Sequence, residues 1–416
     1  MDRRRLLTLA AAGGLSALAP LGLVSGQGGA ARAQTVLPPP PPPISRDERL
    51  ARLATVQRRM QQSGISALVV EPGASLIYFT GVRWSRSERL TCAVIPAEGA
   101  IGIVTPFFEE PSVRESLAVP AEVRTWQEHE SPFAVVAGLL RDRGGAGGVV
   151  AVEETVRFFI VDGLSQALPS AQVRNGAALV RACRMIKSPA ELALMQRASD
   201  ITIAAYRRTI PQIEAGMRPS DIGRIMDRET AALGGIPEFS LVLLGEAAAY
   251  PHGSGKPQAV RPGEVVLMDC GCTFQGYQSD ISRTFVHGEA TAAQRKVWTE
   301  VRKGQAIALE AARVGAEAGS VDDAVRRYYE SLGYGPEYRL PGLSHRTGHG
   351  IGMDGHEPVN LVHGEATRLA PGMCFSNEPG IYIPGAFGVR LEDCFHMTEA
   401  GPQWFSQPAV SIEQPV

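Results

Sequence analysis

Four carboxylates and one imidazole in the C-terminal half of the chain form a set that could hold metal ions. They are Asp269, Asp280, His349, Glu378 and Glu392. Asp269 follows the apolar run Val265 to Met268, so we expect it to stand at the end of a buried strand. An ionised carboxylate in such a place is unstable unless a cation or hydrogen bonds compensate its lost hydration. We therefore predict that these side chains converge on bound cations.

The kinds of ligand atom in this set narrow the choice of metal. Oxygen-rich ligands favour Mn²⁺, Fe²⁺ or Co²⁺, and the single histidine without any thiolate spacing argues against a structural zinc site. Four carboxylates balance the charge of two divalent cations. Two such ions about 3.5–4 Å apart can generate a hydroxide at neutral pH and polarise a carbonyl, which is what amide hydrolysis needs. We expect two divalent ions, with Mn²⁺ favoured and Co²⁺ or Fe²⁺ as alternatives.

Three histidines lie in segments rich in glycine or proline. His349 has a glycine on each side, which lets the backbone approach closely and direct the ring. His252 follows Pro251, and His356 follows Gly355. A histidine in such a segment can be a hydrogen-bonded loop residue, but His252 and His356 could also bind a substrate carbonyl or carry a proton.

The composition is that of an ordinary globular protein, and the N-terminus indicates export. The 416 residues include 41 Lys and Arg and 43 Asp and Glu. This near-neutral balance gives no reason to expect a nucleic-acid partner. Residues 1–33 combine Arg3 to Arg5, a weakly apolar stretch to Val24 and a closing Ala31-Arg32-Ala33. We predict a cleaved twin-arginine-like signal, hence the twin-arginine export machinery and a periplasmic or secreted protein, with an uncleaved anchor as the alternative.

The elements that must position these residues divide into two predicted domains. Residues 34–44, with their proline run, are expected to form a tether. Residues 45–186 begin with a helix capped by Ser45 and alternate β-like runs with helix-like segments, which indicates an α/β domain. A second domain, residues 187–416, begins at the capping box Ser188 to Glu191. The six cysteines show no CxxC spacing and are expected to be buried thiols.

The second domain shows a weak internal repeat. Pro262-Gly263 precedes Asp269, and Pro371-Gly372 precedes Glu378 at the same spacing. Each acidic residue is followed by another, Asp280 in the first case and Glu392 in the second. Helices and antiparallel strands alternate in pairs around them, so the pattern favours an α+β domain made of two duplicated halves, against chance similarity of two short segments.

Seven segments in order resemble the motifs of the pita-bread metallopeptidases, in the branch of Xaa-Pro aminopeptidases and prolidases. They are Pro251-His252, Met268–Gly271, Gly276–Phe285, Thr347–Gly352, His356–Pro358, Asn377–Gly380 and Val389–Asp393. The resemblance covers nearly the whole chain after the export signal. It implies a creatinase-like α/β N-terminal domain, followed by a pita-bread catalytic domain with pseudo-twofold halves.

The resemblance also implies roles for individual residues. Asp269, Asp280, His349, Glu378 and Glu392 would be the metal ligands, with Asp280 and Glu392 bridging the ions and Glu378 also moving a proton. His252 and His356 would contact the scissile amide as non-ligand catalytic histidines. Arg390 and Tyr277 are expected to bind substrate or to support the ligands.

The function implied is a dinuclear exopeptidase that cuts the N-terminal Xaa-Pro bond of short proline-containing peptides through a metal-bridging hydroxide. A prolidase acting on Xaa-Pro dipeptides and a metal-dependent hydrolase or lyase for small molecules remain alternatives. A non-catalytic peptide-binding protein is disfavoured, because four buried carboxylates without metal would repel one another. A homodimer or higher homo-oligomer is expected.

Overall fold

The computed structural model describes residues 37–416. The predicted export signal, residues 1–33, lies outside the described residues, as does the start of the predicted tether. The described part of the tether has no regular secondary structure, but it contacts the folded chain. Arg197 donates a hydrogen bond to the Pro38 carbonyl over 2.7 Å, and Ile44 is buried. Within residues 37–416, no helix is both long and apolar enough to span a bilayer.

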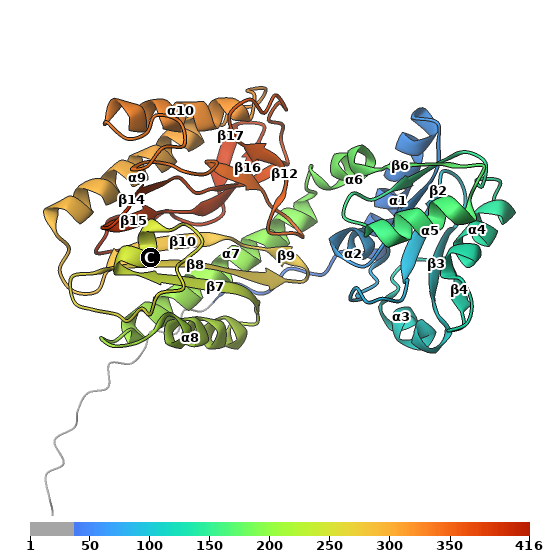
Figure 1. Cartoon of the computed structure of the whole chain (residues 1–416), viewed down its shortest axis with the longest axis horizontal. Coiled ribbons are helices and arrows are strands. Elements are labelled where there is room, and N and C mark those ends of the chain that lie inside the picture. Colours follow the sequence, from blue (N-terminus) through green and yellow to red (C-terminus); the bar gives the residue numbers. More distant parts are fainter. Residues whose placement is uncertain (1–36) are drawn as a thin grey trace, which may run out of the picture. The chain divides into compact units, whose positions relative to one another are not determined.

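The N-terminal domain is a six-stranded mixed sheet with helices on both faces (Figure 1). In spatial order its strands are β4 (Ala121–Trp126), β3 (Ile101–Pro106), β2 (Cys92–Pro96), β1 (Ile65–Val70), β5 (Val149–Val152) and β6 (Gln172–Asn175). Its helices are α1 (Arg46–Gln62), α2 (Ala74–Thr80), α3 (Glu110–Ser116), α4 (Pro132–Asp142), α5 (Phe158–Ala167) and α6 (Ala177–Arg184). The α/β prediction is confirmed.

Alternation along β1 explains how both faces of the sheet are covered. Leu68 and Val70 pack in one core with α1, α2 and α6, whereas Ala67 and Val69 pack in another with α4 and α5. Successive side chains of a strand point to opposite faces, so a continuous apolar run suits a strand buried on both sides.

The first half of the C-terminal domain is a sheet backed by two long helices. Strands β7 (Ile236–Leu244), β8 (Val265–Phe274) and β10 (Ile281–Val286) are antiparallel, with the short β9 (Tyr277–Gln278) paired to β8. Helices α7 (Pro189–Thr209) and α8 (Pro219–Ala232) pack on this sheet through one apolar core. As predicted, Ser188 and Glu191 form a capping box at the start of α7.

The second half repeats this arrangement. Its sheet has the order β12 (Glu357–Leu361), β11 (Gly348–Gly350), β13 (Cys374–Asn377), β16 (Asp393–Thr398) and β17 (Gly401–Trp404), next to the hairpin of β14 (Gly380–Ile383) and β15 (Phe387–Arg390). Helices α9 (Ala292–Ala311) and α10 (Gly319–Ser331) pack against it. Figure 1 shows the strands of both halves between α7 and α8 on one side and α9 and α10 on the other. This is the predicted α+β pita-bread architecture.

One detail differs from the sequence-based expectation. Asp269 does not end its strand: β8 continues to Phe274, and Asp269 pairs with Leu241 on one side and Ser282 on the other. The strand continues because the small residues Cys270, Gly271 and Cys272 still fit between two neighbouring strands. The expectation for the cysteines is confirmed, since all six are free and buried.

The two domains share one apolar core. It contains Leu53 and Val56 of α1 together with Leu194 and Met195 of α7 and, from the second half, Ile351. The boundary between 186 and 187 therefore divides the sequence but not the hydrophobic packing.

Candidate metal centre

All five predicted ligands line one cavity of about 760 Å³. Asp269 lies within β8, Asp280 just before β10, His349 on β11, Glu378 just after β13, and Glu392 between β15 and β16. The first half thus supplies two carboxylates, and the second half supplies two carboxylates and the imidazole. The duplicated arrangement brings together side chains that are far apart in sequence.

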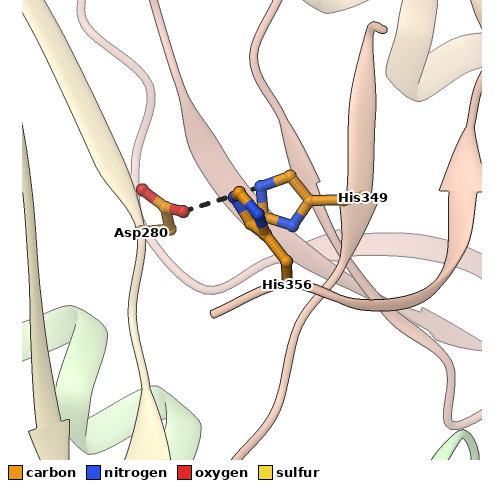
Figure 2. Close-up of side chains that lie close together, drawn as sticks. All are labelled: Asp280, His349 and His356. Atoms are coloured by element: carbon orange, nitrogen blue, oxygen red, sulfur yellow. Dashed lines mark ion pairs between the residues drawn. The ribbon is translucent and has the colours of Figure 1, made fainter. Parts of the chain in front are cut away.

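Potential ligand atoms converge in three overlapping groups. These are Asp269, Asp280 and Glu392; His349, Glu378 and Glu392; and Asp280, His349 and His356, with the atoms of each group within 4.8 Å of one another. Figure 2 shows the last group, in which the rings of His349 and His356 lie side by side opposite Asp280. Such short separations suit a shared cation.

His349 presents the lone pair of a neutral ring to the carboxylates. Its Nδ1 lies 3.0 Å from the Gly350 carbonyl, which fixes the proton on Nδ1. Its Nε2 lies 3.3 Å from Glu378 Oε1 and 3.6 Å from Asp280 Oδ2. Burial, and then the neighbouring His356, hold the pKa of His349 well below its usual value. A neutral imidazole oriented by a backbone carbonyl is the form that binds a metal.

The carboxylates are in an environment that needs positive charge. Burial raises the pKa of Asp280 and Glu392 well above the usual range, and repulsion from the other carboxylates adds to the effect. Burial also raises the pKa of Glu378 to about 7. Among the described residues, Asp269 Oδ1 and Glu392 Oε1 are buried without any hydrogen-bond partner. Such orphaned carboxylate oxygens among oxygen and imidazole donors fit a divalent cation.

Two serines that the sequence analysis missed hold the candidate ligands in place. Ser282 donates to Glu392 Oε2 over 2.7 Å. Ser376 accepts a bond from the His349 amide at 3.0 Å, and its hydroxyl lies 3.3 Å from Glu378 Oε1. Their positions two residues after Asp280 and two before Glu378 put them on the same strand faces as those ligands, a periodicity that could have identified them.

Arg390 lines the cavity and contacts candidate ligands. It donates to Asp269 Oδ2 at 2.5 Å, to the Ser282 hydroxyl at 3.0 Å and to the Pro251 carbonyl at 3.0 Å. The hydroxyl of Tyr382, which also contacts the His345 ring at 2.7 Å, lies 3.3 Å from Arg390. These contacts occupy its guanidinium.

Tyr277 is placed elsewhere. It does not line the cavity, and its hydroxyl donates to Glu191 over 2.7 Å and accepts from Arg52 at 3.1 Å. Tyr277 therefore belongs to a buried polar contact between α7 and α1. Successive side chains of a strand point to opposite sides, so in β9 Gln278 lines the cavity whereas Tyr277 faces away from it.

The two other predicted histidines line the cavity with groups that the sequence analysis did not single out. The ring of His356 lies 4.0 Å from that of His349, centroid to centroid, so the geometry also admits it as a nitrogen donor. His252 also lines the cavity but belongs to none of the three groups. The additional lining residues are Phe239, Leu241, Gln278, His345, Arg346 and Gly355. His345 and Arg346 immediately precede the segment Thr347–Gly352 that contains His349. This proximity in sequence could have identified them as cavity residues.

Comparison with known proteins agrees with this arrangement. Residues 193–399 match the model of metallopeptidase family M24, and residues 52–186 match the creatinase/prolidase N-terminal domain. A probable dipeptidase PepE of Mycobacterium tuberculosis is 33% identical over 355 residues, covering 84% of this chain and 92% of the relative. An Xaa-Pro dipeptidase of Lactobacillus helveticus is 31% identical over 359 residues, covering 85% and 96%.

Solved structures show the same fold over most of the chain. Dipeptidase PepE from Mycobacterium ulcerans superposes with a TM-score of 0.80 at 31% identity, covering 88% of this chain and 97% of that one. The X-Pro aminopeptidase from Thermotoga maritima superposes with a TM-score of 0.77 at 26% identity, covering 88% and 99%. The chain therefore belongs to metallopeptidase family M24, with a creatinase/prolidase N-terminal domain ahead of a pita-bread catalytic domain.

Proposed function

We propose that this hydrolytic peptidase is a dipeptidase that uses two divalent ions, with Mn²⁺ favoured, to cleave Xaa-Pro dipeptides. The observation that carries the proposal is the convergence of five donor side chains, two of them with orphaned buried oxygens, in one cavity. The names of the relatives, a probable dipeptidase and an Xaa-Pro dipeptidase, support the substrate class.

In this proposal the protein supplies orientation and proton transfer. Asp269, Asp280, His349, Glu378 and Glu392 would hold the ions, which when bound supply an activated water and polarise the scissile carbonyl. Glu378 passes a proton to the leaving amine. His252 and His356 donate hydrogen bonds to the carbonyl oxygen as negative charge develops on it. Phe239 and Leu241 offer an apolar wall for a substrate side chain.

An arginine side chain in the cavity, that of Arg346, supports a dipeptide over a longer substrate. Arg346 lines the cavity, and its charge contributes to lowering the pKa values of His356 and His349. Within residues 37–416 its guanidinium has no ion-pair or hydrogen-bond partner, in contrast to Arg390. A free C-terminal carboxylate, which in a dipeptide lies one residue beyond the scissile bond, would pair with it.

The Xaa-Pro aminopeptidase that the sequence analysis favoured is the second candidate. The likeness to the X-Pro aminopeptidase from Thermotoga maritima supports it. An aminopeptidase would accept residues after the proline. Its substrates would carry no C-terminal carboxylate directly after the proline, so Arg346 would have no such group to bind.

The deciding experiment compares substrates that differ only at the C-terminus. Protein starting at residue 34 is stripped with a chelator, reloaded with Mn²⁺ and assayed on an Xaa-Pro dipeptide, its C-terminal amide, an Xaa-Pro-Yaa tripeptide and an Xaa-Ala dipeptide. A dipeptidase cuts the free dipeptide and discriminates against the amide and the tripeptide. Preference for the tripeptide would establish the aminopeptidase, and metal binding without cleavage of any peptide would overturn both.

A matched pair of variants tests the role of Arg346. Arg346→Gln should raise KM for the free dipeptide about 10- to 100-fold, the value of a charge-assisted hydrogen bond, with little effect on the amide. Arg327→Gln, at an exposed site on α10, is the control and should change KM for neither substrate. Equal losses on the dipeptide and the amide would show that Arg346 does not bind the carboxylate.

A further inference from the structure

We propose that Glu357, clamped by Arg184 and Lys187, is a positioning residue that sets where His356 stands in the cavity, so that the N-terminal domain contributes to the reaction. The proposal rests on the peptidase function given above, in which His356 contacts the scissile amide. Glu357, Arg184 and Lys187 are buried charged residues, and none of them takes part in the reaction as described above.

Glu357 binds four donors at once. Its Oε1 accepts from Arg184 Nη2 at 2.5 Å and from the amides of Met353 and Asp354 at 2.9 and 3.2 Å. Its Oε2 accepts from Lys187 Nζ at 2.9 Å. Glu357, Arg184 and Lys187 are each less than a tenth exposed. Although burial alone would raise the pKa of Glu357, Lys187 and Arg184 lower it to about 2, so the clamp remains ionised.

These bonds close the backbone segment that carries His356. Met353 and Asp354 begin the segment, Glu357 ends it, and His356 is the residue before Glu357. One carboxylate therefore ties both ends of the loop together. The loop is built around that carboxylate, since a Cβ on Gly352 would lie 2.7 Å from Glu357 Oε1 and 2.9 Å from Lys187 Cε.

Packing alone does not hold this segment. His356 lines the 760 Å³ cavity of the candidate metal centre and also a second cavity of about 300 Å³, whose wall includes Glu357 and Arg184. His356 is exposed, and although its ring lies 4.0 Å from that of His349, a residue between two cavities is held less firmly by dispersion than a core residue. The position of His356 then depends on the polar anchors of its loop.

The cations come from outside the catalytic motifs. Arg184 is the last residue of α6 in the N-terminal domain, where the helix C-terminus favours a positive charge. It also donates to Asp354 Oδ2 at 2.7 Å and to the Ser75 hydroxyl of α2 at 3.0 Å. Lys187 lies in the connection between the domains, and its amide donates to the Gly372 carbonyl at 2.9 Å. A shift of α6 would therefore reach His356 through Glu357.

The test separates positioning from general stabilisation. Glu357→Gln keeps the size of the side chain but removes the charge, and should lower kcat about 10- to 100-fold, the effect of a small misplacement of a catalytic group, while KM and metal content stay nearly constant. The control is Glu191→Gln, which weakens a comparable buried contact with Arg52 and Tyr277 away from His356. It should lower the melting temperature with little change in kcat.

A double-mutant cycle and a rescue sharpen the result. In a His356→Ala background, Glu357→Gln should cause no further loss of kcat, because both changes remove the same group from the reaction. Arg184→Lys, which keeps a charged donor, should retain more activity than Arg184→Met. Additive losses with His356→Ala, or equal losses from Glu191→Gln and Glu357→Gln, would overturn the proposal.

One readout does not depend on catalysis. The ¹⁵N ring resonances of His356, assigned by their loss in His356→Ala, should shift in Glu357→Gln and not in Glu191→Gln. An unchanged His356 signal in Glu357→Gln would refute the positioning role even if the wild type cuts no peptide. Failure of the wild type on every peptide, with the expected shift present, would overturn only the proposed function.

Discussion

Arg390 donates from Nη2 to Oδ2 of Asp269 over 2.5 Å, joining the second half of the catalytic domain to the first at the candidate metal centre. The pair leaves Asp269 Oδ1 without a partner in the described chain, so the arginine fixes one oxygen and leaves the other for a cation. Through Ser282, which donates to Glu392, Arg390 also orients a carboxylate of its own half. One guanidinium thus organises ligands from both halves.

Replacing Arg390 by lysine should therefore weaken metal binding. A lysine keeps the charge but cannot reach Asp269, Ser282 and the Pro251 carbonyl together, because it lacks the planar fork. We expect about 10- to 100-fold lower affinity for Mn²⁺, measured by titration of chelated protein. Arg368→Lys, at an exposed site, is the control. Unchanged affinity in Arg390→Lys would mean that Asp269 is oriented without it.

Asp280→Asn and His252→Ala should separate ligands from groups that contact substrate. Asp280→Asn removes a donor from two of the three candidate groups and should lose both metal and turnover. His252→Ala should keep its metal, since His252 is in none of the groups, and lose about 100-fold in kcat as an electrostatic donor. Elemental analysis beside the peptide assay checks both. Loss of metal in His252→Ala would contradict the assignment.

Metal binding should strengthen as the pH rises through neutrality. In the metal-free protein, burial raises the pKa of Asp280 and Glu392 and raises that of Glu378 to about 7, so a metal must compete with protons for these carboxylates. Calorimetry in buffers of different ionisation enthalpy should detect proton release. At these three carboxylates the folded metal-free protein binds more protons than the unfolded chain, so their contribution to stability should fall as the pH rises through about 7, and Mn²⁺ should reverse this.

The contribution of Glu357 to folding stability should have the opposite pH dependence, increasing as the pH rises in the acid range. Its pKa is lowered from 4.5 to about 2, so its contribution to stability is complete above about pH 4.5 and disappears as the pH falls towards 2. The shift corresponds to a contribution on the order of 3 kcal/mol. The difference in unfolding free energy between wild type and Glu357→Gln, from denaturant titrations, should shrink over that range. A constant difference would show that the charge of Glu357 does not matter.

The five candidate ligands that line one cavity could be singled out from the sequence because their signals are local. Asp269 follows an apolar run, Glu378 and Glu392 each follow a short strand-like segment, and glycines flank His349. The helix starts at Ser45 and Ser188 could be predicted for the same reason, since a capping side chain bonds within its own first turn. The export signal and the identity and number of the metals stay predictions.

The roles of the supporting residues were not readable, because their partners are distant in sequence. Nothing near Tyr277 indicates that its hydroxyl would meet Arg52 and Glu191 instead of the cavity. Likewise, Arg346 and Arg390 are both arginines beside ligand motifs, yet Arg390 is occupied by Asp269 and Arg346 has no partner within residues 37–416.

The sequence by itself determined the chemistry that can occur: which donors are present, in which order, and on elements that hide their charge from water. Only the tertiary structure decided how those donors are used, by placing β8 beside β10, β13 beside β16, and the end of α6 against Glu357. The physical reason is range. Capping, periodicity and apolar runs act over a few residues, whereas the distance between two charges, and so their pKa values and their choice of partner, depends on how remote strands pack.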